Sequence, residues 1–181
     1  MMTDCRVMYN YLFKKNQLTM KTFFSEKHKL RDANTELYGG ELVKPFERPQ
    51  RLDFIVDEIK TRGLGEILNP NKVNLNIIGK VHDRDYIKFL DNAWNEWIKE
   101  GFKGEAIPTV WPSRSMNSNK IPTFIEGKLG YYCLAGETSI SNGSVEAAYE
   151  AVKVAISAVD TLLNEKLSGI FTSLIVLGKS V

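Results

Sequence analysis

The residues most suggestive of chemistry lie in the stretch "KVHDRDYIKFL", where His82 stands beside Asp83 and Asp85. A calcium-binding loop would need glycine at its sixth position and glutamate at its twelfth, but Lys88 and Trp94 occupy them. A zinc site needs about four ligands, usually drawn from several segments. We therefore interpret Asp83 as the cap of a following helix and His82 as a packed residue before it, with a catalytic or metal-binding cluster as the competing interpretation.

The remaining histidine and the cysteines give weaker signals. His28, in "SEKHKLRD", lies among charges and is interpreted as a solvated loop residue, with a ligand role as the alternative. Cys133, in "GYYCLAGE", has apolar neighbours and no adjacent histidine that could activate it as a nucleophile. A small buried side chain is the expected role for Cys133.

Two glutamates stand apart from the helical patterns. Glu126 and Glu137 lie beside glycines in "IPTFIEGKLGYY" and "LAGETSISNG", which look like loops. Carboxylates in loops are free to face a ligand, and a pair of them favours a cationic one. Each contributes about 0–1 kcal/mol when exposed and more where water is excluded.

Composition restricts the class of protein. The 181 residues suit one domain, and a net charge of +2 gives no tendency towards nucleic acid or a membrane surface. No apolar run approaches the roughly 20 residues that cross a bilayer, and the N-terminal residues do not have the pattern of a secretory signal. With two cysteines, Cys5 and Cys133, we expect a cytoplasmic protein with free thiols.

Strand-like and helix-like segments occur along the chain in an order typical of α/β proteins. Short apolar segments predict strands at 6–13 and 21–26, and Gly39 with Gly40 predicts a turn. The β-branched stretch 169–177 is apolar on both faces, as in a parallel strand that is covered on both sides. We therefore expect an α/β fold with a parallel sheet flanked by helices.

Three helices and one long loop complete the prediction. Apolar spacing predicts helices from about Pro49 to Gly63 and from Asp83 to Glu100, while residues 101–125 have no period and predict an irregular loop. A third helix is expected over 145–165, with Ser144 as its N-cap. Its predicted buried face consists of six apolar residues: Ala148, Val152, Ala155, Ile156, Val159 and Leu163.

Several long motifs resemble a known family. "ERPQR", "KVHDRDYIKFL" and "SNGSVEAAYEAVKVAISAVDTLL" occur in this order in the histone-deacetylase superfamily. "FSEKHKLRDANTELYGGELVKPFE", "GFKGEAI" and "IPTFIEGKLGYYCLAGET" are most similar to the bacterial acetylpolyamine amidohydrolases. The resemblance runs from Met20 to residue 173 and implies the N-terminal portion of the arginase–deacetylase three-layer fold. It divides the chain into an extension, 1–19, and a truncated deacetylase-like domain, 20–181.

The resemblance also implies roles for particular segments. In this family "VHDRDY" is structural and leads into a helix, which supports the non-catalytic interpretation of His82. The loop 101–125 resembles an insertion that mediates dimer contact and narrows the active-site entrance. Glu126 and Glu137 match positions that line this entrance and attract polyamine ammonium groups, so the implied substrate is an acetylated polyamine or similar small cationic amide.

The family's catalytic centre has no counterpart here. Its members hold zinc with two aspartates and one histidine, and they use a histidine pair in "RPPGHH" after the strand that resembles 169–174. This sequence reads "SLIVLGKSV" there and has no histidine after His82. We therefore expect an inactive chain that lacks the metal ligands and catalytic residues and binds no cofactor. The alternative is a non-catalytic polyamine-binding or dimerisation module.

Overall fold

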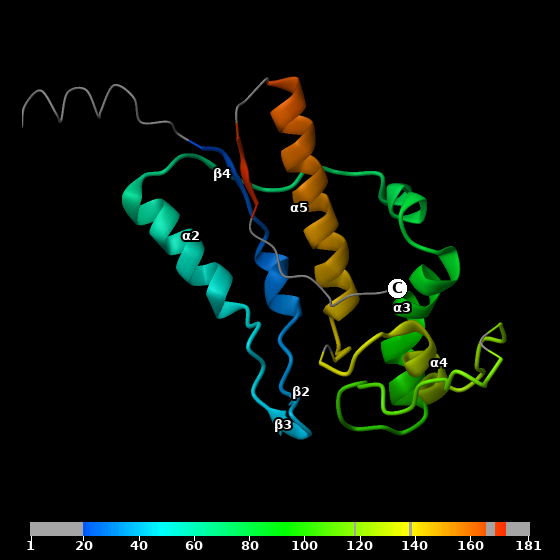
Figure 1. Cartoon of the computed structure of the whole chain (residues 1–181). Helices are drawn as coiled ribbons and strands as arrows, with labels where there is room; N and C mark the ends of the chain where they lie inside the picture. The colour runs from blue at the N-terminus through cyan, green and yellow to red at the C-terminus, as the bar shows by residue number, and fades with distance from the viewer. Residues whose placement is uncertain (1–19, 118, 138, 166–168, 173–181) are drawn as a thin grey trace, which may run out of the picture.

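The computed structural model describes residues 20–117, 119–137, 139–165 and 169–172 (Figure 1). A three-stranded parallel sheet has the order β4-β1-β5, with β1 at Thr22–Phe23, β4 at Ile67–Leu68 and β5 at Phe171–Thr172. Helices pack against this sheet, so the predicted α/β class with a parallel sheet is confirmed. The predicted strand 6–13 and the extension 1–19 lie outside the described residues.

The sheet is covered on both faces because consecutive residues of a strand point to opposite sides. Phe24, which follows β1, packs with Leu52 and Val56 of helix α2 (Gln50–Arg62). Phe23 packs instead with Val154 and Ala158 of helix α5 (Ser144–Asn164). In Figure 1, α2 and α5 accordingly stand on either side of the strands.

Helix α2 matches its prediction closely at the C-terminus. Gly63 adopts a left-handed conformation with φ of 58°, and its N–H bonds to the carbonyls of Ile59 and Lys60. Pro49 stands at the N-cap position, one residue before the helix, where a missing N–H costs nothing.

The first predicted strand within the described residues was too long. After β1 the chain turns into a short 3-10 helix, η1 (Glu26–Leu30), so the predicted strand 21–26 ends early. Of the predicted strand 169–177, the structure describes β5, while residues 173–177 lie outside the described part. The predicted turn is confirmed, since Gly39 and Gly40 have positive φ and join β2 (Glu36–Tyr38) to β3 (Glu41–Val43) in an antiparallel pair.

Helix α5 contacts the sheet with a different face from the predicted one. Its buried residues are Ser144, Ala147, Glu150, Val154, Ser157 and Ala158. The six apolar residues of the predicted face are half-buried or exposed, with Val159 at 53% and Leu163 at 70% exposure. Ser144 is the first helical residue and Gly143 the N-cap; the Ser144 hydroxyl accepts from the backbone N–H of Ser141, so the predicted N-cap was wrong by one position.

A second core lies beside α5 and holds the elements of the candidate site. Helix α3 (Arg84–Lys99), preceded by the 3-10 helix η2 (Leu75–Lys80), packs against helix α4 (Ile125–Tyr132). The core residues are Phe89, Ala93, Trp97, Ala106, Ile125, Leu129 and Ile140. A hydrogen bond connects this core to α5, because the hydroxyl of Tyr149 on α5 donates to Asp91 Oδ1 on α3 at 2.6 Å. Burial, followed by this hydrogen bond, raises the pKa of Tyr149 to about 12.

Candidate functional site

Glu126 lies in the first turn of α4, so its predicted loop context was wrong. The negative charge stands near the positive end of the helix, where it is stabilising. The side chain is exposed, and within the described residues it forms no hydrogen bond or ion pair. Its carboxylate is therefore available to an external cation, and α4 alone determines where it points.

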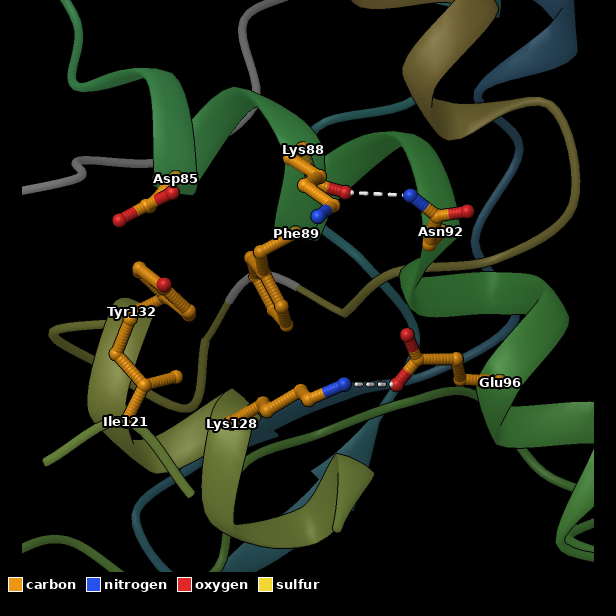
Figure 2. Close-up of a pocket in the computed structure, with 8 residues that line it drawn as sticks. All are labelled: Asp85, Lys88, Phe89, Asn92, Glu96, Ile121, Lys128 and Tyr132. Carbon is orange, nitrogen blue, oxygen red and sulfur yellow. Dashed lines mark hydrogen bonds and ion pairs between the residues drawn. The ribbon is translucent and has the colours of Figure 1, made fainter. Parts of the chain in front are cut away.

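Helix α4 is held by α3, as Figure 2 shows. Lys128 of α4 donates to Glu96 of α3 at 2.6 Å, and the rings of Phe89 and Tyr132 stack with centroids 4.7 Å apart. Eight residues line a groove of about 170 Å³ between the helices, namely Asp85, Lys88, Phe89, Asn92, Glu96, Ile121, Lys128 and Tyr132. Burial, followed by the charge of Asp85, raises the pKa of Tyr132, so this phenol stays neutral at physiological pH.

The segment before α4 fixes the other side of this helix. A Cβ atom at Gly130 would lie 1.6 Å from the carbonyl oxygen of Val110, so the two backbones touch because residue 130 has no side chain. The indole N–H of Trp111 donates to the carbonyl of Cys133 at 2.8 Å. The described residues of the predicted loop 101–125 are thus non-helical up to Phe124, and Ile125 begins α4. Contacts of Val110 and Trp111 with the C-terminal end of α4 hold this segment in place.

Glu137 lies in the connection between α4 and α5 and is exposed. Gly136, just before it, is packed close to Leu37 and Pro108. Ser139, two residues later, is buried and donates to Glu105. Glu137 is therefore an exposed carboxylate on an anchored backbone, and no described side chain neutralises it.

Glu105 is the residue that sequence reasoning missed. Its carboxylate accepts hydrogen bonds from the backbone N–H groups of Asn34 and Thr35, and also from the hydroxyls of Thr35 and Ser139. Ala106, the next residue, forms an antiparallel bridge with Ile140, with both N···O distances at 2.9 Å. One carboxylate thus joins three segments that are far apart in sequence. The only local indication of a structural role for Glu105 was its position in "GEAI", between a glycine and two apolar residues.

The two histidines do not form a common site. His82 is exposed, with its ring 5.8 Å from that of Tyr86, so the prediction that it is packed was wrong. Asp83 does precede α3 as its N-cap, although its side chain makes no capping hydrogen bond. The charge of Asp83 still lies at the positive end of α3, as predicted from the dipole argument.

His28 is buried at 6% exposure, which contradicts the predicted solvated loop residue. It lies in η1, its ring packs on Phe24, and Nδ1 is 2.8 Å from the carbonyl oxygen of Ser25. Nε2 lies 3.5 Å from Asp53 Oδ1 on α2. Glu26, Lys27 and Lys29 are exposed, whereas the imidazole is buried between η1 and α2.

Cys133 directly follows α4 and is half-buried, close to the predicted filler role. Burial raises the pKa of its thiol to about 11, so the reactive thiolate is scarce at neutral pH. Among the residues that the structure describes, no group of three or more His, Cys, Asp or Glu side chains could hold a metal ion.

Comparison with known proteins agrees with this architecture. The histone deacetylase domain matches residues 45–175. An acetylpolyamine amidohydrolase from Mycoplana ramosa is 49% identical over 143 residues, which is 79% of this chain and 42% of the relative. Acetylpolyamine amidohydrolase 2 from Pseudomonas aeruginosa is 35% identical over 145 residues, again 42% of its length. The chain thus spans about two fifths of the length of the curated relatives that it matches.

The solved structures give the same fold. The crystal structure of an acetylpolyamine aminohydrolase from Burkholderia pseudomallei superposes with a TM-score of 0.71 at 22% identity, over 80% of this chain and 42% of that one. At this identity the likeness establishes the fold, which is the predicted arginase–deacetylase fold. Because the domain match covers most of the chain, the protein belongs to the histone deacetylase domain family.

Proposed function

We propose that this chain is the first part of a deacetylase of the acetylpolyamine amidohydrolase type, and that the complete assembly hydrolyses N-acetyl groups of small cationic amines. The 49% identity to the Mycoplana ramosa acetylpolyamine amidohydrolase over 79% of the chain carries this proposal. The place of action that we propose is the cytoplasm. Consistent with this, none of the described helices is long and apolar enough to cross a membrane.

The part of the active site that this chain supplies is the entrance. We assign Glu126 and Glu137 to the attraction of the substrate's ammonium groups, because both are exposed acids without described ion-pair partners. Glu105 holds the backbone next to Glu137, and α3 together with residues 110–111 holds α4 next to Glu126. These contacts hold the backbone near both glutamates, while their carboxylates remain open to solvent.

Zinc chemistry belongs to the remaining part of the fold. Zinc would polarise the acetyl carbonyl and activate water. The described residues do not fit such a site, since the nearest acidic partner of buried His28 is one aspartate, Asp53, on a different element from the entrance acids. No catalytic step is therefore assigned to the residues of this chain.

We further propose that the complete protein forms a homodimer through residues 101–125. Large apolar side chains are exposed on and beside this loop: Val110, Trp111, Met116, Ile121, Phe124 and Leu134. An exposed apolar surface of this kind commonly marks a protein–protein contact.

The proposal is tested by fusing the chain to the remaining part of the Mycoplana ramosa relative and measuring kcat/KM. Glu126→Gln and Glu137→Gln should reduce hydrolysis of acetylputrescine by about 1–2 kcal/mol of transition-state binding, while a neutral acetamide substrate is unaffected. Glu100→Gln, an exposed acid at the end of α3, is the matched control. Equal losses on both substrates would mean that the glutamates shape the entrance and do not recognise charge.

The unfused chain provides a second check. It should contain far less than one zinc ion per molecule and should not hydrolyse acetylputrescine when zinc is added. Turnover that a chelator abolishes would overturn the assignment of zinc chemistry to the remaining part. An inactive fusion with correctly loaded zinc would overturn the proposed reaction.

A further inference from the structure

A larger cavity lies where η2 and α3 meet α5, away from the entrance acids. Its volume is about 720 Å³, which is within the range of sites that bind small molecules. Figure 1 shows η2 and α3 on the same side of α5, and the hydrogen bond from Tyr149 to Asp91 joins α5 to α3 there. Eight residues line the cavity, namely Leu75, Asn76, Ile78, Gly79, Lys80, Arg84, Ile87 and Tyr149. None of them lines the groove between α3 and α4, so the two sites are separate.

The inner part of this cavity is apolar. Leu75 and Ile78 of η2 and Ile87 of α3 line it, and each of these residues is half-buried. Tyr149 adds an aromatic ring from α5, and the bond of its hydroxyl to Asp91 holds this ring against α3. Side chains held in this way offer a preformed apolar surface to the aliphatic or aromatic part of a ligand.

The charged residues that line the cavity are both cations. Lys80 and Arg84 are exposed, and neither side chain forms a hydrogen bond or an ion pair with any residue that the structure describes. Asp83 and Asp85 flank Arg84 in the sequence, but neither of them lines the cavity. Asn76, which is also exposed, adds a side-chain amide that can donate a hydrogen bond. The outer part of the cavity therefore offers donors and positive charge to an anion.

We propose that this cavity binds a small organic anion, whose phosphate or carboxylate group is bound by Lys80 and Arg84 and whose apolar body lies against Ile87 and Tyr149. The two cations supply charge-assisted hydrogen bonds, and a guanidinium can hold two oxygens of one head group. Exposed charge pairs contribute little by themselves, so the affinity requires the apolar contact as well. The inference does not depend on the proposed deacetylation, whose substrate carries the opposite charge.

The test is a titration of the chain with phenyl phosphate and with benzoate, measured by calorimetry and by the amide chemical shifts of the protein. We expect saturable binding, with the largest shift changes at Gly79, Lys80, Arg84 and Ile87. Benzyl alcohol, which lacks the charge, and inorganic phosphate, which lacks the apolar body, should each bind about tenfold more weakly than the better anion. Tighter binding of phenyl phosphate than of benzoate would identify a phosphate as the preferred head group, and the reverse order a carboxylate.

Three variants of the lining residues test the assignment of roles. Lys80→Gln and Arg84→Gln should each raise the Kd of the better anion by about threefold or more, because each removes one cation. Ile87→Ala should raise it by a similar factor, of about threefold, because it removes part of the apolar surface. Lys88→Gln is the matched control, since Lys88 is an exposed cation of α3 that lines the other groove, and it should leave Kd unchanged.

Several outcomes would overturn the proposal. Lys80 and Arg84 are exposed, so the circular dichroism spectra of their variants should match that of the parent chain, and unchanged Kd values in both would exclude this site. Benzylamine, which has the same ring and a positive charge, must bind more weakly than the anions; equal binding would show that charge is not recognised. Shift changes confined to residues 101–125, or no binding at millimolar concentrations of either anion, would also overturn it. Binding is measured without turnover, so failure of the proposed function leaves this inference standing.

Discussion

Ser25 and Glu150, 125 positions apart in the sequence, share a buried hydrogen bond in which the Ser25 hydroxyl donates to Glu150 Oε1 at 3.0 Å. Ser25 also caps η1, where its oxygen accepts from the N–H of Lys27. Glu150 lies on the buried face of α5 and accepts a second bond from Lys153 at 2.9 Å. The pair therefore fixes the end of the first strand segment to the helix that covers it.

Acid should weaken this connection. Burial alone would raise the pKa of Glu150, but the hydrogen bonds from Lys153 and Ser25, with the charges of Lys153 and Lys27, lower it below its ordinary value. A carboxyl with a depressed folded pKa stabilises the protein above its unfolded pKa of about 4.3, and the contribution is lost as the pH falls through the folded value. Urea unfolding from pH 7 down to 3 should show this loss in the parent chain and a shallower decline in Glu150→Gln. At pH 7, Glu150→Ala should cost about 1–3 kcal/mol, whereas Glu146→Gln on the exposed face should cost almost nothing.

Removing the Glu105 carboxylate should loosen three segments together. Glu105→Ala leaves the N–H groups of Asn34 and Thr35 and the hydroxyl of Thr35 without their acceptor, with an expected cost of about 1–3 kcal/mol. The hydroxyl of Ser139 also loses a bond to Glu105 but keeps the Thr35 carbonyl as an acceptor at 3.4 Å. Amide exchange should accelerate at Asn34 and Thr35 and around Ser139. If exchange rises at Asn34 and Thr35 while residues 136–140 stay protected, the bridge between Ala106 and Ile140 holds that segment by itself.

The contact between α4 and the preceding segment should not tolerate one additional carbon atom. Gly130→Ala places a Cβ against the Val110 carbonyl, so either α4 or the segment must move, at about 1–3 kcal/mol. Gly79→Ala is the matched control, because an added Cβ there meets nothing within 4 Å. A thermal melt of each variant decides the matter: equal melting temperatures would mean that residues 110–111 do not pack on α4 in solution.

Cys133 should react slowly with iodoacetamide. With the pKa of its thiol raised to about 11 by burial, less than about one part in a hundred is thiolate at pH 8. Mass spectrometry should show Cys133 modified much more slowly in the folded chain than in urea. Equal rates in both states would mean that the Cys133 thiol is not buried in the folded chain.

Periodicity predicted the positions of helices better than their orientations. The bounds of helix α3 were predicted to within one residue at each end, and its buried residues Phe89, Ala93 and Trp97 belong to the core that it shares with α4. For α5 the more hydrophobic stripe was taken as the core face, but the sheet contacts the side that carries Glu150 and Ser157. The burial of two polar residues depends on partners from distant segments, Ser25 for Glu150 and the N–H of Asn71 for Ser157, which a local pattern does not contain.

For the site residues too, local sequence patterns predicted some properties, whereas those that depend on distant partners were missed. Glu126 and Glu137 were recognised as unpaired acids from their local context, and both are exposed in the structure. Two assignments failed because they depended on tertiary packing: Glu126 is in α4, which packs against α3, and His28 is buried beside α2. Glu105 escaped notice because its partners, Asn34, Thr35 and Ser139, are far from it in sequence.

The different environments of the three tryptophans provide an optical reporter of the entrance. Trp97 is buried, stacks on Phe102 at 4.0 Å and donates to the Gly104 carbonyl. Trp111 is 42% exposed and is held by its bond to Cys133 at the end of α4. Acrylamide should therefore quench the emission of Trp111 first. In a chain carrying Trp97→Phe and Trp94→Phe, a red shift of the remaining emission would signal release of α4 before the rest of the fold unravels.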